Sequence, residues 1–375
     1  MTDDQRAADE VWMDRAIARG GRGHPSPNPH VGAVVIGTDG ALVAEGHHDR
    51  AGEPHAEVAA LRVAGDKAQG GTLYVTLEPC NHVARTPKCT DAILASGIAR
   101  VVIGCRDPNP TVPGAGVEAL RAAGIEVLLG VRETAARRLI APFTKFITTG
   151  IPYVSLKLAL SLDGRIATRT GSSQWVTGSE ARARVHVLRA AHDAVGVGIG
   201  TALADDPLLT VRAAPGRSPA RVVFDTRLRL PLHSQLVRTA RQVALWVICG
   251  PDAPEAHEDA LVTSGAHVLR APISPEGRVD ASAALKLLAS GGVVSILVEG
   301  GAELAGSMLA GRLADELHAF LAPILLGPRG RPGAVDWAGP TTPSEAPRVA
   351  DPQWEVCGQD AHVFGPLVYP EHPDR

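Results

Sequence analysis

The stretch PHAEVAAL at residues 54–61 decides how the first half of this chain is interpreted. It places His55 and Glu57 two positions apart at the start of an expected helix. Together with Cys80 and Cys89, it supplies one imidazole nitrogen and two thiolates, a ligand set typical of Zn²⁺. Three protein ligands leave one tetrahedral position for a water whose pKa the metal lowers to about 7. Glu57 would not bind the metal but would carry the proton from that water to a leaving amine.

Two other interpretations of these residues stay open, because the cysteines are further apart than in the usual C-x-x-C. Cys80 and Cys89 are ordinary buried thiols in the first, and His82 completes a closed structural zinc site in the second. The catalytic interpretation is favoured by position, since we expect both His55 and Cys80 at helix starts, where the helix dipole stabilises a thiolate. The order H-x-E…P-C is also the general signature of zinc-dependent nucleobase deaminases.

Around these residues, helical and strand periodicities alternate, which predicts a three-layer α/β domain. Asp39-Gly40 predicts a tight hairpin turn between the first two strands. The expected helices cover 8–19, 55–64, 90–96 and 117–123, and the expected strands cover 31–37, 41–46, 71–77, 100–105 and 125–130.

The pattern breaks at residues 141–152, which contain two prolines and a glycine. We place the domain boundary there and expect domains at 1–146 and 150–370. The second domain is again α/β, with residues 328–360 in loops. Its expected strands cover 153–160, 194–200, 221–225, 243–249, 294–300, 316–327 and 362–369, and its expected helices cover 179–190 and 303–311.

Two glycine-rich turns in the second domain suggest a nucleotide site. GVGIGT (196–201) and VEGGAEL (298–304) both follow expected strands, where glycines let phosphate groups approach the backbone. A plain turn explains either one alone, and neither is a clean Rossmann fingerprint. Their occurrence together favours nucleotide binding.

Composition excludes several classes of protein. The chain has 375 residues and a formal net charge of -3, without a basic arm, which argues against a nucleic-acid partner. It contains no apolar run long enough for a membrane span and begins without a signal peptide. Five cysteines are too few for a disulfide scaffold, so we expect a cytoplasmic protein in which Cys105, Cys249 and Cys357 belong to the core.

Nine segments resemble the bifunctional riboflavin-biosynthesis deaminase–reductases of the RibD type. They are PSPNPHVGAVVI (25–36), GHHDRAGEPHAEVAAL (46–61), YVTLEPCNHVARTPKC (74–89), DPNPTVPGAGVEAL (107–120), SLKLALSLDGRIA (155–167), GSSQWVTG (171–178), HVLRAAHDAVGVGIGTALADDPLLTVR (186–212), VEGGAELAGSML (298–309) and DELHAFLAPILLG (315–327). The resemblance implies a cytidine-deaminase-like domain followed by a dihydrofolate-reductase-like domain. It also implies Zn²⁺ and NADPH as cofactors, a phosphoribosyl pyrimidine as substrate, and a homo-oligomer.

The resemblance also implies roles for individual residues. In the first domain, Asn28 and His47 would line the pyrimidine pocket, with Arg85 and Thr86 near the phosphate-ribose. In the second, NADPH would contact Ala159, Trp175, Thr201, Asp205, Thr226 and the 301–305 turn that starts at Gly301, and substrate would contact Ser173, Arg189, Leu209, Arg212 and Glu299.

Lys157 stands in an apolar strand, and a lysine there needs a partner. It either contacts the ribose and takes part in proton transfer, or belongs to a structural ion pair. Asp206 is one candidate for its partner.

The implied reactions are hydrolytic removal of the 2-amino group of 2,5-diamino-6-(5-phosphoribosylamino)pyrimidin-4-one, then reduction of the ribosyl group of the aminouracil to ribityl. The chain departs from the family pattern at Ala84, Lys88 and Ala141, where the family usually has Gly, Pro and Asn. An alternative is therefore a repurposed paralogue with an active reductase half and an altered deaminase half.

Overall fold

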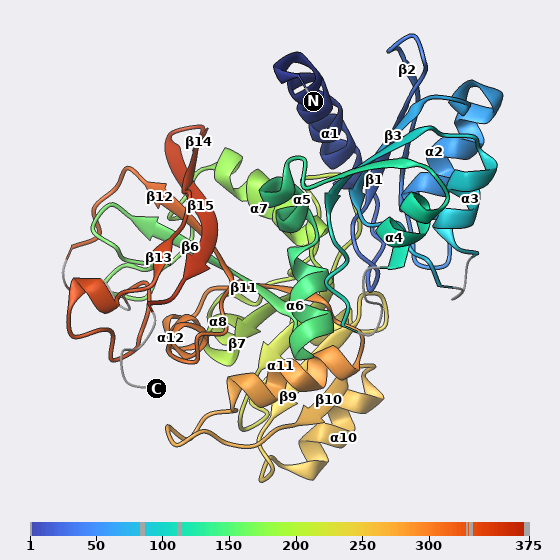
Figure 1. Ribbon diagram of the computed structural model, residues 1–375. Helices are drawn as coiled ribbons and strands as arrows, with labels where there is room; N and C mark the ends of the chain where they lie inside the picture. The colour runs from blue at the N-terminus through green and yellow to red at the C-terminus, as the bar shows by residue number, and fades with distance from the viewer. Residues whose placement is uncertain (1, 83–86, 111–114, 328, 330–332, 371–375) are drawn as a thin grey trace. The chain divides into compact units, whose positions relative to one another are not determined.

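The chain forms two compact units in a computed structural model, Met1–Gly150 and Ile151–Arg375 (Figure 1). The structure describes residues 2–82, 87–110, 115–327, 329 and 333–370. Each unit has its own sheet and its own hydrophobic core. Within the described ranges, no helix is both long enough and apolar enough to cross a membrane.

The first unit is built on a five-stranded sheet in the order β2-β1-β3-β4-β5. β1 pairs antiparallel with β2 and β3, whereas β3, β4 and β5 run parallel. The strands are β1 (Gly32–Ile36), β2 (Leu42–His47), β3 (Thr72–Leu77), β4 (Arg100–Cys105) and β5 (Glu126–Leu129). The helices are α1 (Asp3–Gly20), α2 (Ala56–Ala64), α3 (Cys89–Ala95), α4 (Ala115–Ala122), α5 (Glu133–Leu139) and α6 (Ala141–Thr149), with a 3-10 turn, η1 (Gly65–Ala68).

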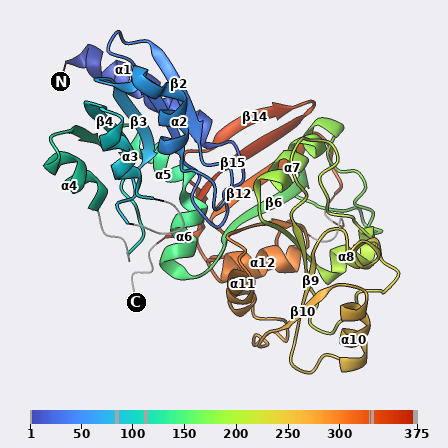
Figure 2. The ribbon, with the colours of Figure 1, turned by 90° about the vertical axis from the view of Figure 1, so that its right-hand side faces the viewer.

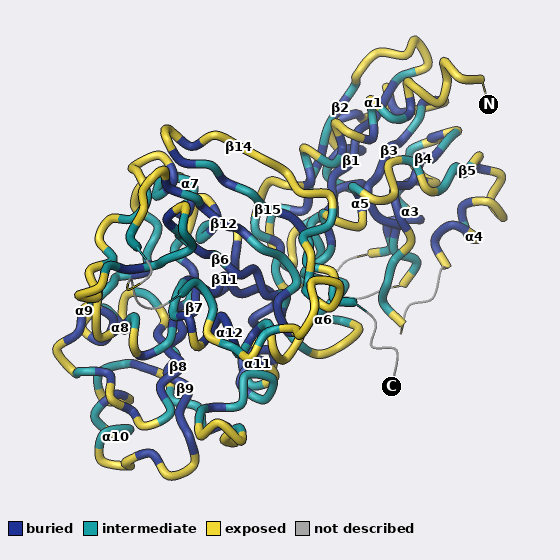
Figure 3. Tube along the Cα trace, turned by 90° about the vertical axis from the view of Figure 1, so that its left-hand side faces the viewer, coloured by how far each residue is buried: buried dark blue, intermediate teal, exposed yellow. Residues whose placement is uncertain are grey.

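Successive side chains of a strand point to opposite faces of the sheet, and both faces of this sheet are apolar. The buried strands are dark blue in Figure 3. Val35 and Val75 point to the face covered by α2, which contributes Ala60. Val34 and Tyr74 point to the opposite face, where α1 contributes Met13. The expected three-layer α/β domain is therefore confirmed.

Residues 141–152 differ from the expected break. α6 occupies Ala141–Thr149, with Pro142 in its first turn, where a missing N–H costs no helical hydrogen bond. The helix ends at Gly150, whose φ of 68° is left-handed. The division between the two units follows directly after this glycine.

A buried ion pair fixes α1 to the sheet of the first unit. Asp9 is completely buried and accepts hydrogen bonds from both Nη atoms of Arg100, at 2.7 and 2.8 Å. The hydroxyl of Tyr74 donates a third bond to Asp9, at 2.8 Å. Burial raises the pKa of Asp9, but the bonds from Arg100 and Tyr74 outweigh it and lower the pKa below its usual value.

We expect Asp9→Asn to lower the free energy of unfolding at pH 7 by about 3 kcal/mol, because it leaves the buried end of Arg100 without its counter-charge. An unfolded aspartate titrates near ~3.9, so the contribution of the charge is present above that pH and is lost as the pH falls through the lower folded pKa. The difference in the free energy of unfolding between wild type and Asp9→Asn should therefore become smaller below about pH 4. Urea unfolding at pH 7 and at pH 3 measures this difference, with the exposed Asp4→Asn as control. An equal difference at the two pH values would contradict the ionic explanation.

The second unit is built on a ten-stranded sheet in the order β10-β9-β8-β7-β11-β6-β12-β15-β13, with β14 paired to β15. The seven neighbouring strands from β10 to β12 in this order run parallel, and β15 is antiparallel to β12. The strands are β6 (Tyr153–Ser161), β7 (Ala194–Gly198), β8 (Ala220–Phe224), β9 (Leu245–Cys249), β10 (His267–Arg270), β11 (Ser295–Glu299), β12 (Glu316–Ala322), β13 (Arg348–Val349), β14 (Gln353–Cys357) and β15 (Asp360–Val368). The helices are α7 (Ser179–Ala191), α8 (Ile199–Asp205), α9 (Gln235–Arg238), α10 (Glu255–Thr263), α11 (Ala281–Ser290) and α12 (Ala302–Ala310).

The expectation that residues 328–360 form loops is wrong in part. β14 pairs with β15 as a long hairpin, visible in Figure 2. Trp354 and Val356 of β14 are 67% and 85% exposed, so the strand lacks the buried face from which a strand is normally predicted. Cys105, Cys249 and Cys357 are all buried, as expected.

Candidate active sites

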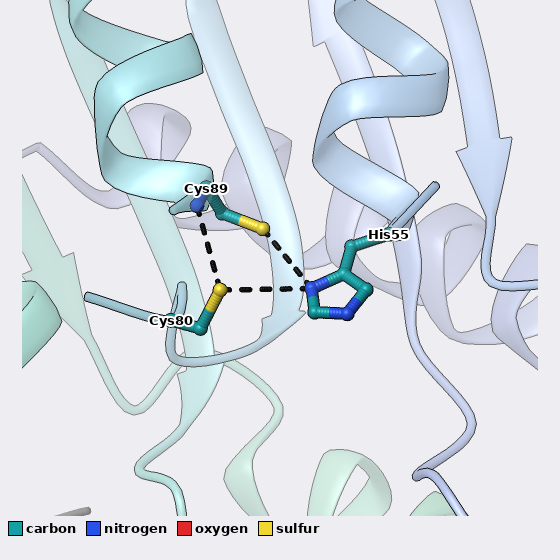
Figure 4. A group of neighbouring side chains, drawn as sticks. All are labelled: His55, Cys80 and Cys89. Carbon is teal, nitrogen blue, oxygen red and sulfur yellow. Dashed lines mark hydrogen bonds between the residues drawn. The ribbon is translucent and has the colours of Figure 1, made fainter. Parts of the chain in front are cut away.

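Three side chains of the first unit converge as a metal-binding group (Figure 4). The ligand atoms of His55, Cys80 and Cys89 all lie within 4.8 Å of one another. His55 Nδ1 lies 3.2 Å from Cys89 Sγ and 3.6 Å from Cys80 Sγ. One imidazole nitrogen and two sulfurs converging in this way fit the donor preference of Zn²⁺.

Two helix starts and one strand end bring these ligands together. His55 is the N-cap of α2 and Cys89 is the first residue of α3. The helix start expected for His55 is confirmed. The helix start expected for Cys80 is wrong, because Cys80 lies in the irregular segment after β3 and its Sγ accepts a bond from the Cys89 backbone N–H at 3.4 Å.

Hydrogen bonding shifts the pKa values of the three ligand side chains. The bonds from Cys89 and His55 lower the pKa of Cys80 below that of a free thiol, although burial opposes the shift. The bond to Cys80 also raises the pKa of His55 and of Cys89. Both cysteines bind a metal as thiolates, so coordination would release the proton that the pair retains.

Glu57 is placed to act on protons rather than to bind the metal. It is the second residue of α2, is 3% exposed, and is outside the three-ligand group. Burial raises the pKa of its carboxyl above the usual value. A carboxyl with a raised pKa can both accept and return a proton near neutral pH.

A fourth protein ligand is not found among the described residues. His82 is exposed and does not belong to the group formed by His55, Cys80 and Cys89. The described ligand set thus keeps the open position that a catalytic zinc site needs. Ala84, Arg85 and Thr86 lie outside the described residues.

His48, rather than its neighbour His47, faces the metal-binding group. The ring of His48 lies 5.1 Å from that of His55 and is almost completely buried. Its Nδ1 donates to the Pro54 carbonyl at 3.1 Å, so Nε2 accepts from the Asn28 amide at 3.0 Å. His47 instead points toward Asp49, with 3.6 Å between Nε2 and Oδ1. Two adjacent histidines at the end of a strand gave no sequence signal to separate them.

The second unit contains a cavity of about 1320 Å³ at the carboxyl ends of its central parallel strands. A ligand site at this edge is general for open parallel sheets. Lys157 and most of the reductase residues that the resemblance implies line this cavity: Ala159, Ser173, Trp175, Arg189, Thr201, Asp205, Leu209, Arg212, Thr226, Glu299 and Gly301. Ala305, the last residue of the 301–305 turn, is not among the lining residues.

Two glycine turns form the middle of the cavity. Gly198 ends β7, and Gly300 and Gly301 join β11 to α12 on the adjacent strand. Gly300 and Gly301 have φ of 75° and 86°, in the left-handed region that favours glycine. A Cβ built on Gly301 would lie 3.4 Å from Thr201 Oγ1 and would fill the hollow between the turns. A bare backbone of this kind fits the diphosphate of a nucleotide cofactor.

A charged network lies at the β6 side of the cavity. Arg189 binds Glu299 with both nitrogens of its fork, at 2.5 and 2.8 Å, and donates to the Thr210 carbonyl at 3.1 Å. Lys157 faces Glu299 across the β6–β11 pairing. Burial lowers the pKa of Lys157, while the charge of Glu299 opposes that shift. Lys157 therefore has Glu299 as its counter-charge.

Neighbouring polar groups complete this side. Asp206 accepts the Gln235 backbone N–H at 2.8 Å and is not among the charges that perturb Lys157, so it is not the lysine's partner. Asp205 is one of those charges, and it accepts a bond from Ser173 at 3.1 Å. Arg189, which the resemblance implies as a substrate contact, uses its fork for Glu299 in this structure.

The chain matches known families over both units. The model of the RibD C-terminal domain matches residues 152–363, and that of the cytidine and deoxycytidylate deaminase zinc-binding region matches residues 6–105. The riboflavin biosynthesis protein RibD of Aquifex aeolicus is 41% identical over 362 residues, covering 96% of this chain and 98% of the relative. The chain belongs to the RibD family.

Solved structures match nearly the whole length of the chain. Acinetobacter baumannii RibD, form 1, matches with a TM-score of 0.84 and 38% identity over 98% of this chain and all of that chain. A Thermotoga maritima diaminohydroxyphosphoribosylaminopyrimidine deaminase/5-amino-6-(5-phosphoribosylamino)uracil reductase matches with a TM-score of 0.82 and 35% identity over the same shares. The protein is thus an enzyme with a zinc-binding deaminase unit and a reductase unit.

Proposed function

We propose that this enzyme catalyses two consecutive steps of riboflavin biosynthesis. The first is deamination of 2,5-diamino-6-(5-phosphoribosylamino)pyrimidin-4-one, in residues 1–146, and the second is NADPH-dependent reduction of the resulting ribosyl group, in residues 150–370. One observation carries the proposal: the three-ligand metal group and the glycine-lined cavity occur in one chain that aligns almost end to end with a riboflavin-biosynthesis relative.

In the deaminase unit, His55, Cys80 and Cys89 would hold Zn²⁺, which when bound supplies a water of pKa near ~7. Glu57 takes the proton from that water and returns it to the 2-amino group, which leaves as ammonia while the ring carbon becomes a carbonyl. We keep Asn28 and His47 as the proposed pyrimidine contacts, and we assign to His48, whose ring nitrogens are bonded to the Pro54 carbonyl and the Asn28 amide, the role of holding Asn28 in place.

In the reductase unit, NADPH would lie along the two glycine turns, and when bound it supplies the hydride for C1 of the opened ribose. Lys157 and Glu299 hold and move protons at the ribose, since both face the β6 side of the cavity. Arg212 is our candidate for the sugar phosphate, because the fork of Arg189 is occupied by Glu299. Ala159, Trp175, Thr201, Asp205 and Thr226 remain the proposed cofactor contacts, and Ser173 and Leu209 remain proposed substrate contacts.

The proposal predicts about one zinc per chain and two separable activities. We expect Cys89→Ser to lose most of its zinc and its ammonia release, because serine replaces a thiolate with a much weaker ligand. NADPH oxidation on the deaminated aminouracil should continue, since that cavity belongs to the other unit. Metal analysis and the two assays measure this, with Cys105→Ser, a buried cysteine outside the metal group, as the matched control.

Full zinc and full ammonia release in Cys89→Ser would contradict the metal site. NADPH oxidation without ammonia release in the wild type would instead favour the single-activity paralogue, in which the changes at Ala84 and Lys88 have altered the deaminase.

We also propose a cytoplasmic location and a homo-oligomer. The five cysteines are all free, which suits a reducing compartment. Light scattering of the purified enzyme tests the oligomeric state.

A further inference from the structure

A second group of possible metal ligands lies on the hairpin formed by β14 and β15, which is red in Figure 1. The register of the hairpin places Glu355 directly opposite His362, with Cys357 two residues further along β14. Residues opposite each other, and residues two apart along a strand, point to the same face of a sheet. Glu355, Cys357 and His362 therefore lie on one face of the hairpin.

The spacing of the three side chains suits a small divalent ion. Their ligand atoms all lie within 4.8 Å of one another, and Glu355 Oε2 lies 3.3 Å from His362 Nδ1. Metal–ligand bonds of about 2.0–2.3 Å in a tetrahedral zinc site place neighbouring donors roughly 3.3–3.8 Å apart. His362 is completely buried and Cys357 is nearly so, whereas Glu355 reaches the surface, so a water molecule can complete the coordination.

Hydrogen bonds behind His362 direct a lone pair of its ring toward this group. His318 Nε2 lies 3.3 Å from Glu316 Oε2, and because a carboxylate only accepts, the proton of His318 is on Nε2. In this neutral tautomer, His318 Nδ1 accepts the N–H of His362 Nε2 at 3.1 Å. The other ring nitrogen of His362, Nδ1, is then an acceptor that faces the carboxylate of Glu355. Two facing acceptors need a cation between them, and metal-binding histidines are commonly oriented by such a bond from the second nitrogen.

Two aromatic rings hold His362 in the position of a ligand. Its ring stacks with Phe320 at 4.1 Å and with Phe364 at 4.5 Å between ring centres. A ligand whose rotamer is fixed by packing loses little conformational freedom when a metal binds.

We propose that Glu355, Cys357 and His362 form a second zinc site, separate from the metal group of the first unit, that stabilises the β14–β15 hairpin. Thiolate and imidazole ligands favour Zn²⁺ over Mg²⁺ and Ca²⁺, which prefer oxygen donors. Binding releases the thiol proton of Cys357.

The second site is the weaker of the two. It has one thiolate where the first group has two, and the positive charge of Arg184 lies close by, with 3.3 Å between Nε and Glu355 Oε2. Enzyme purified without added metal should therefore carry about one zinc per chain and take up a second when Zn²⁺ is supplied.

Equilibrium dialysis of the zinc-loaded enzyme against increasing Zn²⁺ measures this second zinc. Cys357→Ser should lose it, and Glu355→Gln should bind it about ten-fold more weakly. Arg184→Met should bind it about ten-fold more tightly, because the change removes a positive charge beside the ion. Cys249→Ser, which changes a buried cysteine of β9 outside the group, is the matched control and should bind as wild type does.

Cobalt tests whether sulfur binds the added ion. Co²⁺ added to the zinc-loaded wild type should produce a thiolate-to-metal charge-transfer band in the near ultraviolet, which Cys249→Ser keeps and Cys357→Ser lacks. Far-ultraviolet circular dichroism of Cys357→Ser separates loss of the metal from loss of folding, and the exposed Glu355→Gln provides a variant that leaves the buried ligands in place.

The inference would be overturned by a wild type that takes up no second metal, or by equal uptake in wild type and Cys357→Ser. Unchanged affinity in both Glu355→Gln and Arg184→Met would also overturn it. Failure of the proposed deaminase site is a separate outcome, because that site is measured by the first zinc and by ammonia release.

Discussion

Glu57→Gln should lower the rate of ammonia release by about 10³-fold while leaving zinc content and reductase activity unchanged. Glutamine fills the same buried site beside Cys89 but cannot accept a proton from water or return one to the leaving amine. Steady-state ammonia release, metal analysis and NADPH oxidation on the deaminated substrate measure the three quantities on one preparation.

The matched control for this change is Glu53→Gln. Glu53 is exposed, lies two residues before His55 and forms a surface ion pair with Arg50 at 3.8 Å. Near-normal ammonia release in Glu57→Gln, or an equal loss in Glu53→Gln, would remove Glu57 from the proton-transfer role.

Arg189→Met should destabilise the second unit by about 3 kcal/mol, because it leaves the buried carboxylate of Glu299 without its bidentate partner. Burial raises the pKa of Glu299, but the charges of Arg189 and Lys157 lower it below its usual value, so Glu299 is ionised at neutral pH. For a unit of this size, the loss corresponds to a fall in Tm of roughly 6–12 °C. Tryptophan fluorescence follows it, since Trp12 alone of the five tryptophans lies in the first unit.

The double variant Arg189→Met/Glu299→Gln should recover part of that stability but not the reductase activity, because it removes the carboxylate that lost its bidentate partner and, with it, the counter-charge of Lys157. The exposed Arg241→Met, which loses one bond to the Thr263 carbonyl, is the control and should change the free energy of unfolding by less than about 1 kcal/mol. A double variant as unstable as the single one would contradict the explanation that the charge of Glu299 causes the loss of stability.

Most of the candidate site in the first unit could be predicted from the types of its residues and their order in the chain. His55, Cys80, Cys89 and Glu57 were recognisable from residue type and order, because a zinc-dependent deaminase needs one open metal position and a nearby proton carrier. Which of the adjacent His47 and His48 lies beside His55 was not predictable, because it depends on which ring the Pro54 carbonyl and the Asn28 amide hold.

In the second unit, the glycine turns, the apolar strands and the isolated charge of Lys157 could all be predicted from the residues, since each follows from the properties of a short segment. The pairing of Lys157 with Glu299 and the occupied fork of Arg189 became visible only in the folded chain. These pairings join residues far apart in the chain, and they depend on strand order, which local periodicity does not encode.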